Sequence, residues 1–238
     1  MTERDLSIVT GASRGIGKGI ALRLAEESYN VMIFGRDINA LKDVQKEIKD
    51  KGVECEYFSG DVADVNFVND SVSKILRKNK RIDLVVNNAG IGIMKKVMDA
   101  ELDDFKKQVD ANLFGVFNFS KAVLNSMIEN GKGSIINIAS LAGKNSFVGG
   151  SMYSATKHAV LGFARSLMLE VRQYNIKGAT ICPGSVDTQF GSGGHDPRSK
   201  GEILQPEDVA EAVISVIKLP VRALISEIDL RPTNPKKQ

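Results

Sequence analysis

The sequence has few cysteines, little excess charge and no long apolar segment, and each shortage narrows what the chain can be. Its two cysteines, Cys55 and Cys182, belong to no metal-type cluster or disulfide framework. We therefore expect reduced thiols in a cytosolic (cytoplasmic) protein and no metal site. The net charge of +3 is too small to indicate nucleic acid or an anionic membrane as partner. No apolar run approaches the ~18 residues of a membrane span, and the charged start M-T-E-R-D predicts no signal peptide.

The remaining composition is that of an ordinary globular protein. Hydrophobic residues make up 42% of the chain and charged residues 26%. Short apolar runs alternate with longer amphipathic ones, and runs such as L-S-I-V-T and V-M-I-F-G are almost continuously apolar. Such runs are typical of parallel strands covered on both faces. Without a repeat, linker or break in composition, we predict one α/β domain, residues 1–238, with a doubly wound parallel sheet.

The alternation sets the expected elements. The predicted strands are Leu6–Thr10, Asn30–Gly35, Glu54–Ser59, Ile82–Asn87, Gly133–Ser140, Lys177–Pro183 and Ala223–Leu230. The predicted helices are Gly15–Glu27, Ile38–Lys51, Val65–Lys78, Leu102–Asn130, Met152–Gln173 and Pro206–Lys218. Gln189–Leu204 has loop composition throughout, and so long a structureless span is usually functional. We predict a substrate loop over residues 189–204.

A glycine-rich turn, T-G-A-S-R-G-I-G, follows the first predicted strand and opens a helix. Its glycines, Gly11, Gly15 and Gly17, allow a tight turn and a close approach of the backbone to a pyrophosphate. The helix N-terminus behind them presents free N–H groups to the phosphates. The turn therefore predicts a dinucleotide site.

Tyr153 and Lys157 lie four residues apart in a predicted helix, so their side chains share one face. An unperturbed tyrosine titrates near ~10. A nearby ammonium favours the phenolate, so we expect Lys157 to lower the pKa of Tyr153 toward working pH. Tyr153 would then serve as a proton donor and acceptor.

Further motifs join these two, and the series resembles the short-chain dehydrogenase/reductase family over nearly the whole chain. They are Asp61-Val62, N-N-A-G at 87–90, a set of Asn112, Ser140, Tyr153 and Lys157, and P-G-S-V-D-T at 183–188. The resemblance implies a Rossmann fold with helices on both faces of a seven-stranded sheet, in the order 3-2-1-4-5-6-7. It also implies a cofactor that contacts Gly11, Ser13, Arg14, Gly15, Ile16, Gly17, Arg36, Asp61, Val62, Asn88, Ala89, Gly90, Tyr153, Lys157, Pro183, Gly184, Val186 and Thr188.

The second predicted strand ends in F-G-R-D, which bears on the choice between NAD and NADP. Asp37 stands about 20 positions beyond the glycine turn, where an acid binds the ribose hydroxyls of NAD. Arg36 precedes it, however, and Arg14 adds a second cation. Guanidinium groups bind a phosphate through charge-assisted hydrogen bonds. We predict that NADP(H) is preferred, with NAD(H) as the alternative, and that Asp37 caps the next helix.

The resemblance also assigns catalytic roles. Tyr153 protonates the carbonyl oxygen of the substrate and Ser140 orients that oxygen. Lys157 holds the nicotinamide ribose, Asn112 anchors a water that passes protons to Lys157, and Thr188 bonds the nicotinamide carboxamide. These residues predict hydride transfer between the cofactor and a carbonyl/alcohol pair.

The substrate pocket is expected to be apolar, with Ile91–Met94, Leu141–Gly143, Phe147, Val148, Met152 and the substrate loop as its lining. Within that loop His195, Arg198 and Lys200 would either anchor a carboxylate or, as we favour, be solvated. The C-terminal sequence lacks the V-D-G-G-like end of many members and resembles the branch that acts on small alcohols, ketones, aldehydes and 3-hydroxy acids. Reduction of a 3-oxoacyl-carrier-protein is the alternative.

The same residues argue against two other classes of protein and predict an assembly. A non-catalytic dinucleotide sensor would typically have lost Tyr153 or Lys157, and the chain has no length for the substrate domain of sugar-nucleotide epimerases. Helices 102–130 and 152–173 match the pair through which family members associate. We therefore expect a homodimer or homotetramer.

Overall fold

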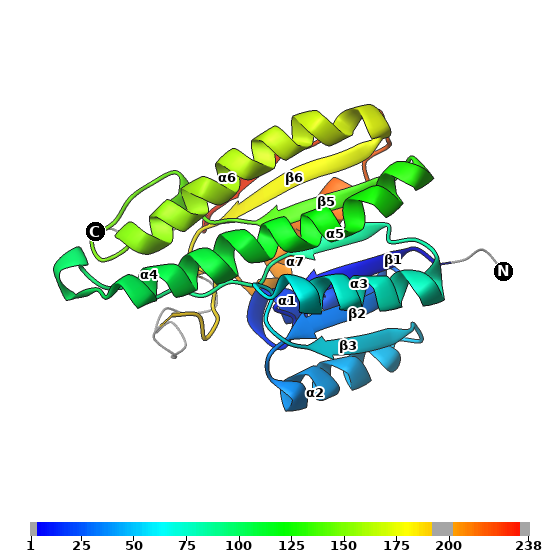
Figure 1. Cartoon of the computed structure of the whole chain (residues 1–238), viewed down its shortest axis with the longest axis horizontal. Helices are drawn as coiled ribbons and strands as arrows, with labels where there is room; N and C mark the ends of the chain where they lie inside the picture. Colours follow the sequence, from blue (N-terminus) through cyan, green and yellow to red (C-terminus); the bar gives the residue numbers. More distant parts are fainter. Residues whose placement is uncertain (1–3, 192–201, 234–238) are drawn as a thin grey trace.

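A computed structural model describes residues 4–191 and 202–233, and strands alternate with helices along them (Figure 1). In chain order the elements are β1 (Leu6–Thr10), α1 (Gly15–Glu26), β2 (Asn30–Gly35), α2 (Ile38–Lys49), β3 (Cys55–Ser59), α3 (Val65–Asn79), β4 (Leu84–Asn87), α4 (Leu102–Val109), α5 (Gly115–Asn130), β5 (Gly133–Ile138), α6 (Ser151–Val171), β6 (Ile176–Pro183), α7 (Pro206–Ile217) and β7 (Glu227–Leu230). Among these residues no helix is both long and apolar enough to cross a membrane.

The strands form one parallel sheet in the order β3-β2-β1-β4-β5-β6-β7. The predicted α/β Rossmann fold and strand order are therefore confirmed. The chain winds outward on one side from β1 and on the other from β4, so its direction reverses between these two neighbours. In such sheets ligands bind beyond the carboxyl ends of the strands at that reversal.

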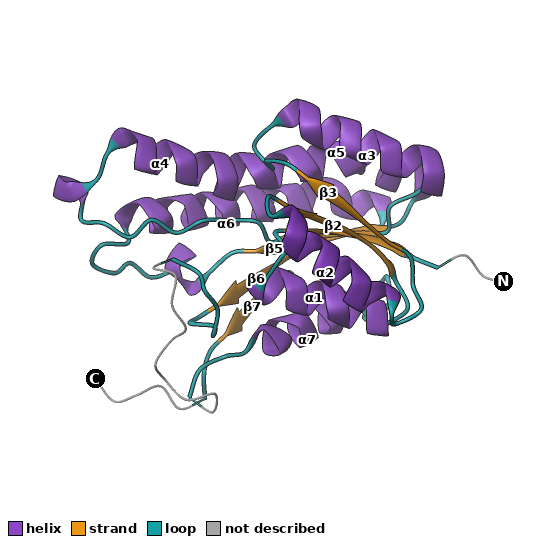
Figure 2. Cartoon of the chain, turned by 90° about the horizontal axis from the view of Figure 1, so that it is seen from below, coloured by secondary structure: helices purple, strands orange, loops and turns teal. Residues whose placement is uncertain are grey.

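Helices cover both faces of the sheet. Helices α3, α4, α5 and α6 lie on one face, and α1, α2 and α7 lie on the other (Figure 2). Within β1, Val9 packs into the apolar cluster under α1 and α7, whereas Ile8 packs into the cluster under α3 and α5. Both faces of the strand are thus buried, which is why its sequence is continuously apolar.

The predicted single helix over 102–130 is wrong. Its regular winding stops at a π-helical turn, Asp110–Phe114, which separates α4 from α5. A π turn holds an extra residue per turn and is frequent at functional sites. The apolar pattern continues through it, so periodicity alone does not reveal it.

The sequence set some other boundaries too far along the chain. The predicted strand 133–140 ends at Ile138, and Ser140 caps the short 3-10 turn Leu141–Gly143 by accepting a hydrogen bond from Ala142 N at 3.1 Å. Much of the predicted substrate loop, residues 192–201, lies outside the described residues. Its last residue, Leu204, bridges to Val186 and accepts a hydrogen bond from Asp187 N at 2.8 Å.

Candidate active site

A cavity of about 1500 Å³ opens at the carboxyl ends of the strands. Every residue predicted to contact the cofactor lines it, and so does Ser140. Asn112 does not line the cavity, although its neighbour Ala111 does. The structure therefore brings together in one cavity residues that lie far apart in the sequence, from Gly11 after the first strand to Thr188 after the sixth.

The glycine turn forms one wall of this cavity. Gly11 has a φ of +66°, and a Cβ on Gly17 would lie 2.3 Å from the Gly11 carbonyl oxygen. Asn88 holds the turn from β4, because its Nδ2 donates to the carbonyls of Thr10 at 2.9 Å and Gly11 at 3.2 Å. The side chain of Asn88 thus supports the turn itself. The glycines are therefore required for close packing of the turn against α1 and the loop after β4, and the packed turn lines the cavity.

The far end of the cavity holds two cations and two acids. Asp37 caps α2 by accepting from Asn39 N and Ala40 N, both at 3.1 Å, as predicted. Asp61 accepts from Ala63 N at 2.9 Å. Among the described residues, no hydrogen bond or ion pair involves the guanidinium of Arg14 or Arg36. Both acids are therefore engaged with their own backbone, and both cations face the cavity.

Tyr153 and Lys157 lie one turn apart in α6, on the side that faces the ends of β5 and β6. The Lys157 Nζ atom is 5.8 Å from the centroid of the Tyr153 ring and donates to the Ile138 carbonyl at 3.0 Å. Both residues are more than nine-tenths buried. A Cβ on Gly90 would lie 3.8 Å from Lys157 Nζ, so the loop after β4 also reaches this point.

Burial controls the ionisation of this pair. It raises the pKa of Tyr153 to about 12, and a side-chain hydrogen bond with Ser140 opposes that rise. It lowers the pKa of Lys157 to about 8. The predicted fall in the Tyr153 pKa is therefore wrong for this structure, because desolvation of the phenolate outweighs the hydrogen bond with Ser140. Tyr153 is a neutral hydrogen-bond donor, and Lys157 is the group that titrates near neutral pH.

Asn112 lies within the π-helical turn and is fully buried. Its Nδ2 donates to the Ile91 carbonyl at 2.9 Å and to Thr156 Oγ1 at 3.0 Å, and its Oδ1 accepts from Ile91 N at 2.7 Å. Thr156 in turn donates to the Tyr153 carbonyl at 2.8 Å. The amide therefore joins the loop after β4 to the helix of Tyr153. Both of its N–H groups are already used within the protein.

The model of the short chain dehydrogenase family matches residues 6–196. The chain belongs to this family. It is also 35% identical to an uncharacterized oxidoreductase of Staphylococcus saprophyticus over 228 residues, which are 95% of this chain and 97% of that protein. The chain is thus an oxidoreductase of the short-chain dehydrogenase family.

Solved structures are similar over almost all of their length. An alcohol dehydrogenase from the archaeon Thermococcus sibiricus, complexed with 5-hydroxy-NADP, superposes with a TM-score of 0.92 at 31% identity and covers 99% of this chain and 100% of its own. The closed form of a serine dehydrogenase complexed with NADP+ has a TM-score of 0.85 at 30% identity, with 94% of each chain covered. Both proteins therefore share the fold of this short-chain dehydrogenase.

The substrate end of the short-chain dehydrogenase cavity is largely apolar, as predicted. Ile91, Gly92, Met94, Leu141, Ala142, Phe147 and the start of the predicted loop, Gln189–Gly191, line it. The Phe190 ring lies 5.7 Å from the Tyr153 ring. Four predicted members do not contribute. Ile93 and Gly143 do not line the cavity, Val148 is 85% exposed, and Met152 is buried away from the cavity. His195, Arg198 and Lys200 lie outside the described residues.

Sequence reasoning missed several lining residues, among them Asn145, Ser146, Arg231 and Pro232. The last two directly follow β7, whose Leu230 carbonyl accepts from Gly184 N at 2.8 Å. A signal existed, because residues just after a parallel strand lie at the carboxyl edge of the sheet. The prediction of a strand over 223–230 placed its end correctly, although β7 begins only at Glu227, and it did not consider the residues that follow.

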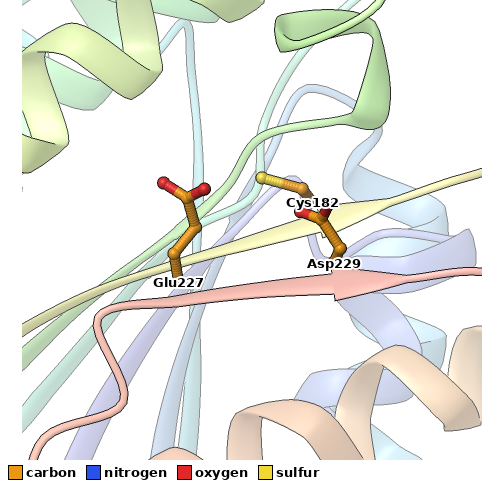
Figure 3. Close-up of side chains that lie close together, drawn as sticks. All are labelled: Cys182, Glu227 and Asp229. Carbon is orange, nitrogen blue, oxygen red and sulfur yellow. The ribbon is translucent and has the colours of Figure 1, made fainter.

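A cluster of charged side chains lies behind this end, at the outer edge of the sheet. Cys182 of β6 and the carboxylates of Glu227 and Asp229 on β7 come together, with ligand atoms within 4.8 Å of one another (Figure 3). The Lys144 ammonium bonds both carboxylates and holds their pKa values below the ordinary range. The carboxylates therefore already hold a cation of the chain's own. Sequence spacing does not indicate this cluster, because it joins three separate segments.

Proposed function

We propose that this short-chain dehydrogenase transfers hydride between NADP(H) and a carbonyl/alcohol pair, with Tyr153 as the general acid/base. The observation that carries the proposal is the position of Tyr153, Ser140 and Lys157 at one end of a cavity whose other end presents Arg14 and Arg36. The glycine turn also lines the cavity, where its backbone can approach a pyrophosphate. The residues present thus fit a dinucleotide along the whole cavity.

NADPH supplies the hydride when it is bound. Tyr153 donates its proton to the carbonyl oxygen, and its high pKa keeps the proton on the phenol until charge develops on that oxygen. The Ser140 hydroxyl orients the same oxygen. Lys157 returns a proton to Tyr153, because its pKa of about 8 allows exchange near neutral pH.

The route of that proton avoids the Asn112 side chain, whose amide already bonds Ile91 and Thr156. We assign the relay water instead to a backbone carbonyl of the Asp110–Phe114 turn, since π turns free carbonyls from the regular ladder. Asn112 is then a positioning residue, which fixes Ile91 and α6 relative to each other.

NADP(H) is proposed over NAD(H) because of the charges at the far end. Arg14 and Arg36 have no acid bonded to them in the described chain, whereas Asp37 is engaged as the cap of α2. A guanidinium pair suits a 2′-phosphate. The complexes of both solved relatives with NADP or its derivative support the same choice.

The proposed substrates are small ketones, aldehydes or 3-hydroxy acids, and we propose that the enzyme works as a homo-oligomer. Helices α4 and α5 follow each other end to end, and α6 runs alongside them on the same face of the sheet (Figure 1). Phe114 of the π-helical turn, Phe117 of α5 and Leu169 of α6 are each exposed by more than two-fifths. Gly162 leaves space for a close approach, since a Cβ on it would meet nothing within 4 Å. Light scattering of the purified protein measures the mass, and a monomer would contradict this assembly.

Tyr153→Phe tests the function. Loss of the proton donor is expected to lower turnover by about 100- to 10 000-fold, while NADPH binding, measured by its fluorescence, stays close to wild type. Cofactor absorbance is followed with small ketones, aldehydes, 3-oxo acids and an acetoacetyl thioester. Tyr174→Phe is the matched control, because this tyrosine lies past α6 and does not line the cavity. Full activity of the Tyr153 variant would contradict the proposal.

A further inference from the structure

Arg231 enters the cavity from an unexpected side. The β6–β7 pairing ends with Pro183 opposite Leu230, so the next residue of the chain lies at the carboxyl edge of the sheet. There it adjoins Gly184, where a Cβ would approach Leu230 O at 3.5 Å and Pro232 Cδ at 3.7 Å. Arg231 therefore lines the same cavity as Ser140 and Tyr153, next to the turn that precedes Thr188.

The ion-pair network around Arg231 contains one more cation than it has carboxylates. Glu227 bonds Lys144 and Arg165, and Asp229 bonds Lys144 and Arg231. Three cations thus share two carboxylates in this network. Asp229 holds Lys144 at 2.5 Å but Arg231 only at 3.4 Å. The cation that is held most loosely is the one that lines the cavity.

At this end of the cavity, no other cation of the described chain besides Lys157 is available to bind an anionic group of a substrate. Apart from the catalytic Lys157, Arg231 is the cation that lines the substrate end in the described chain. Asn145 and Ser146 add neutral polar groups, and Asp187 is an acid with an interaction of its own. The remaining walls are largely apolar, with Gln189 as a further neutral polar group. Such a lining suits an apolar compound with one anionic end.

We propose that Arg231 is a specificity-determining residue that binds a carboxylate of the substrate, so that the preferred substrates are oxo acids and the corresponding hydroxy acids. The inference rests on the proposed function and deepens it. The guanidinium offers two parallel N–H donors to a carboxylate, and its side chain is 55% exposed, free to turn from Asp229 toward the cavity. The substrate anion takes the place of the weak contact with Asp229.

A pair of substrates that differ in one negative charge and one methyl group tests this role. We would compare 3-oxobutanoate with its methyl ester, using NADPH, wild type and Arg231→Gln. The ratio of kcat/KM for the acid to that for the ester is expected to fall by about 10- to 100-fold in the variant, mainly through a higher KM for the acid. Arg231→Lys is expected to recover part of the ratio, because it restores the charge without the bidentate fork.

Arg165→Gln is the matched control. It removes a guanidinium from the same network, through Glu227, but Arg165 does not line the cavity. Its ratio of acid to ester is expected to equal that of wild type. High salt should reduce the preference for the acid in wild type and leave the Arg231→Gln ratio nearly constant.

The outcomes separate the inference from the proposed function. If the enzyme reduces the ester but the ratio is the same in wild type and Arg231→Gln, the role of Arg231 is overturned and the reductase stands. An equal fall of the ratio in Arg165→Gln would also overturn it, because the network as a whole would then be responsible. Turnover of neither substrate, nor of any neutral ketone, with NADPH would overturn both.

Discussion

The two halves of the cavity are built in different ways. In the cofactor half, backbone atoms nearly touch: a Cβ on Gly11 would lie 2.8 Å from Ala89 Cα, and one on Gly17 would lie 2.3 Å from Gly11 O. In the substrate half, side chains form the wall, and Met94, Phe147 and Phe190 are each more than two-fifths exposed. The cofactor half therefore tolerates little substitution, whereas the substrate half can vary and carries specificity.

A glycine-to-alanine substitution in each half is expected to give the largest difference in stability between the halves. In Gly17→Ala the new Cβ would also lie 2.4 Å from Asn88 Nδ2, so backbone must shift. We expect the free energy of unfolding to fall by about 3 kcal/mol or more, with loss of NADPH binding. Gly191→Ala meets nothing within 4 Å, and its φ of +83° costs about 1 to 2 kcal/mol. Urea unfolding measures the stability of both variants. Equal losses in the free energy of unfolding would contradict the difference between the two halves.

Lys157 lies where the two halves meet. Burial of its ammonium is expected to have the next largest effect, a dependence of stability on pH. Its pKa is about 8 in the folded protein against 10.5 in the unfolded chain. Between these values the unfolded state binds the extra proton, so stability rises with pH. The free energy of unfolding of wild type, relative to Lys157→Met, should therefore increase by up to about 3 kcal/mol from pH 8 to 10.5. A difference that stays constant over this range would mean that the ammonium is well solvated.

Arg36 tests whether side chains can set selectivity within the rigid half as well. Replacing it with aspartate removes a guanidinium from the 2′-phosphate end and adds a repulsive charge. We expect Arg36→Asp to raise the Kd of NADPH about 10- to 100-fold more than the Kd of NADH. Fluorescence titration with both cofactors measures the ratio. Equal weakening of the two would assign the preference for NADP(H) to other residues.

The same division explains what could be predicted from sequence. Strands β1 and β2 have the predicted bounds, and Asp37 caps α2 as expected. These features depend on local patterns: continuous apolar runs, a glycine turn and a capping acid. Most of the cofactor half consists of such short motifs, so the sequence located its residues in one cavity.

The features that were missed depend on contacts between distant segments. The π-helical turn that interrupts 102–130 accompanies the bonds of Asn112 to Ile91 and Thr156. Burial decides the pKa of Tyr153, and spacing to Lys157 does not report burial. Arg231 reaches the cavity only through the pairing of β7 with β6. The π-helical turn and the burial of Tyr153 are not visible in a local window of sequence. The place of Arg231 directly after a predicted strand was a signal that the prediction did not use.

Lys144 gives the smallest expected effect and tests how loosely the substrate half is held. Its ammonium joins the turn after Ser140 to Glu227 and Asp229 on the edge strand, and its side chain is 26% exposed. Partly exposed pairs stabilise weakly, so Lys144→Met should lower the free energy of unfolding by about 1 kcal/mol, and by less at high salt. Lys107→Met is the matched control, because it removes a single exposed pair with Asp103 and is expected to change stability less. A loss from Lys144→Met as large as that from Gly17→Ala would show that side-chain contacts hold the substrate half as firmly as backbone contacts hold the cofactor half.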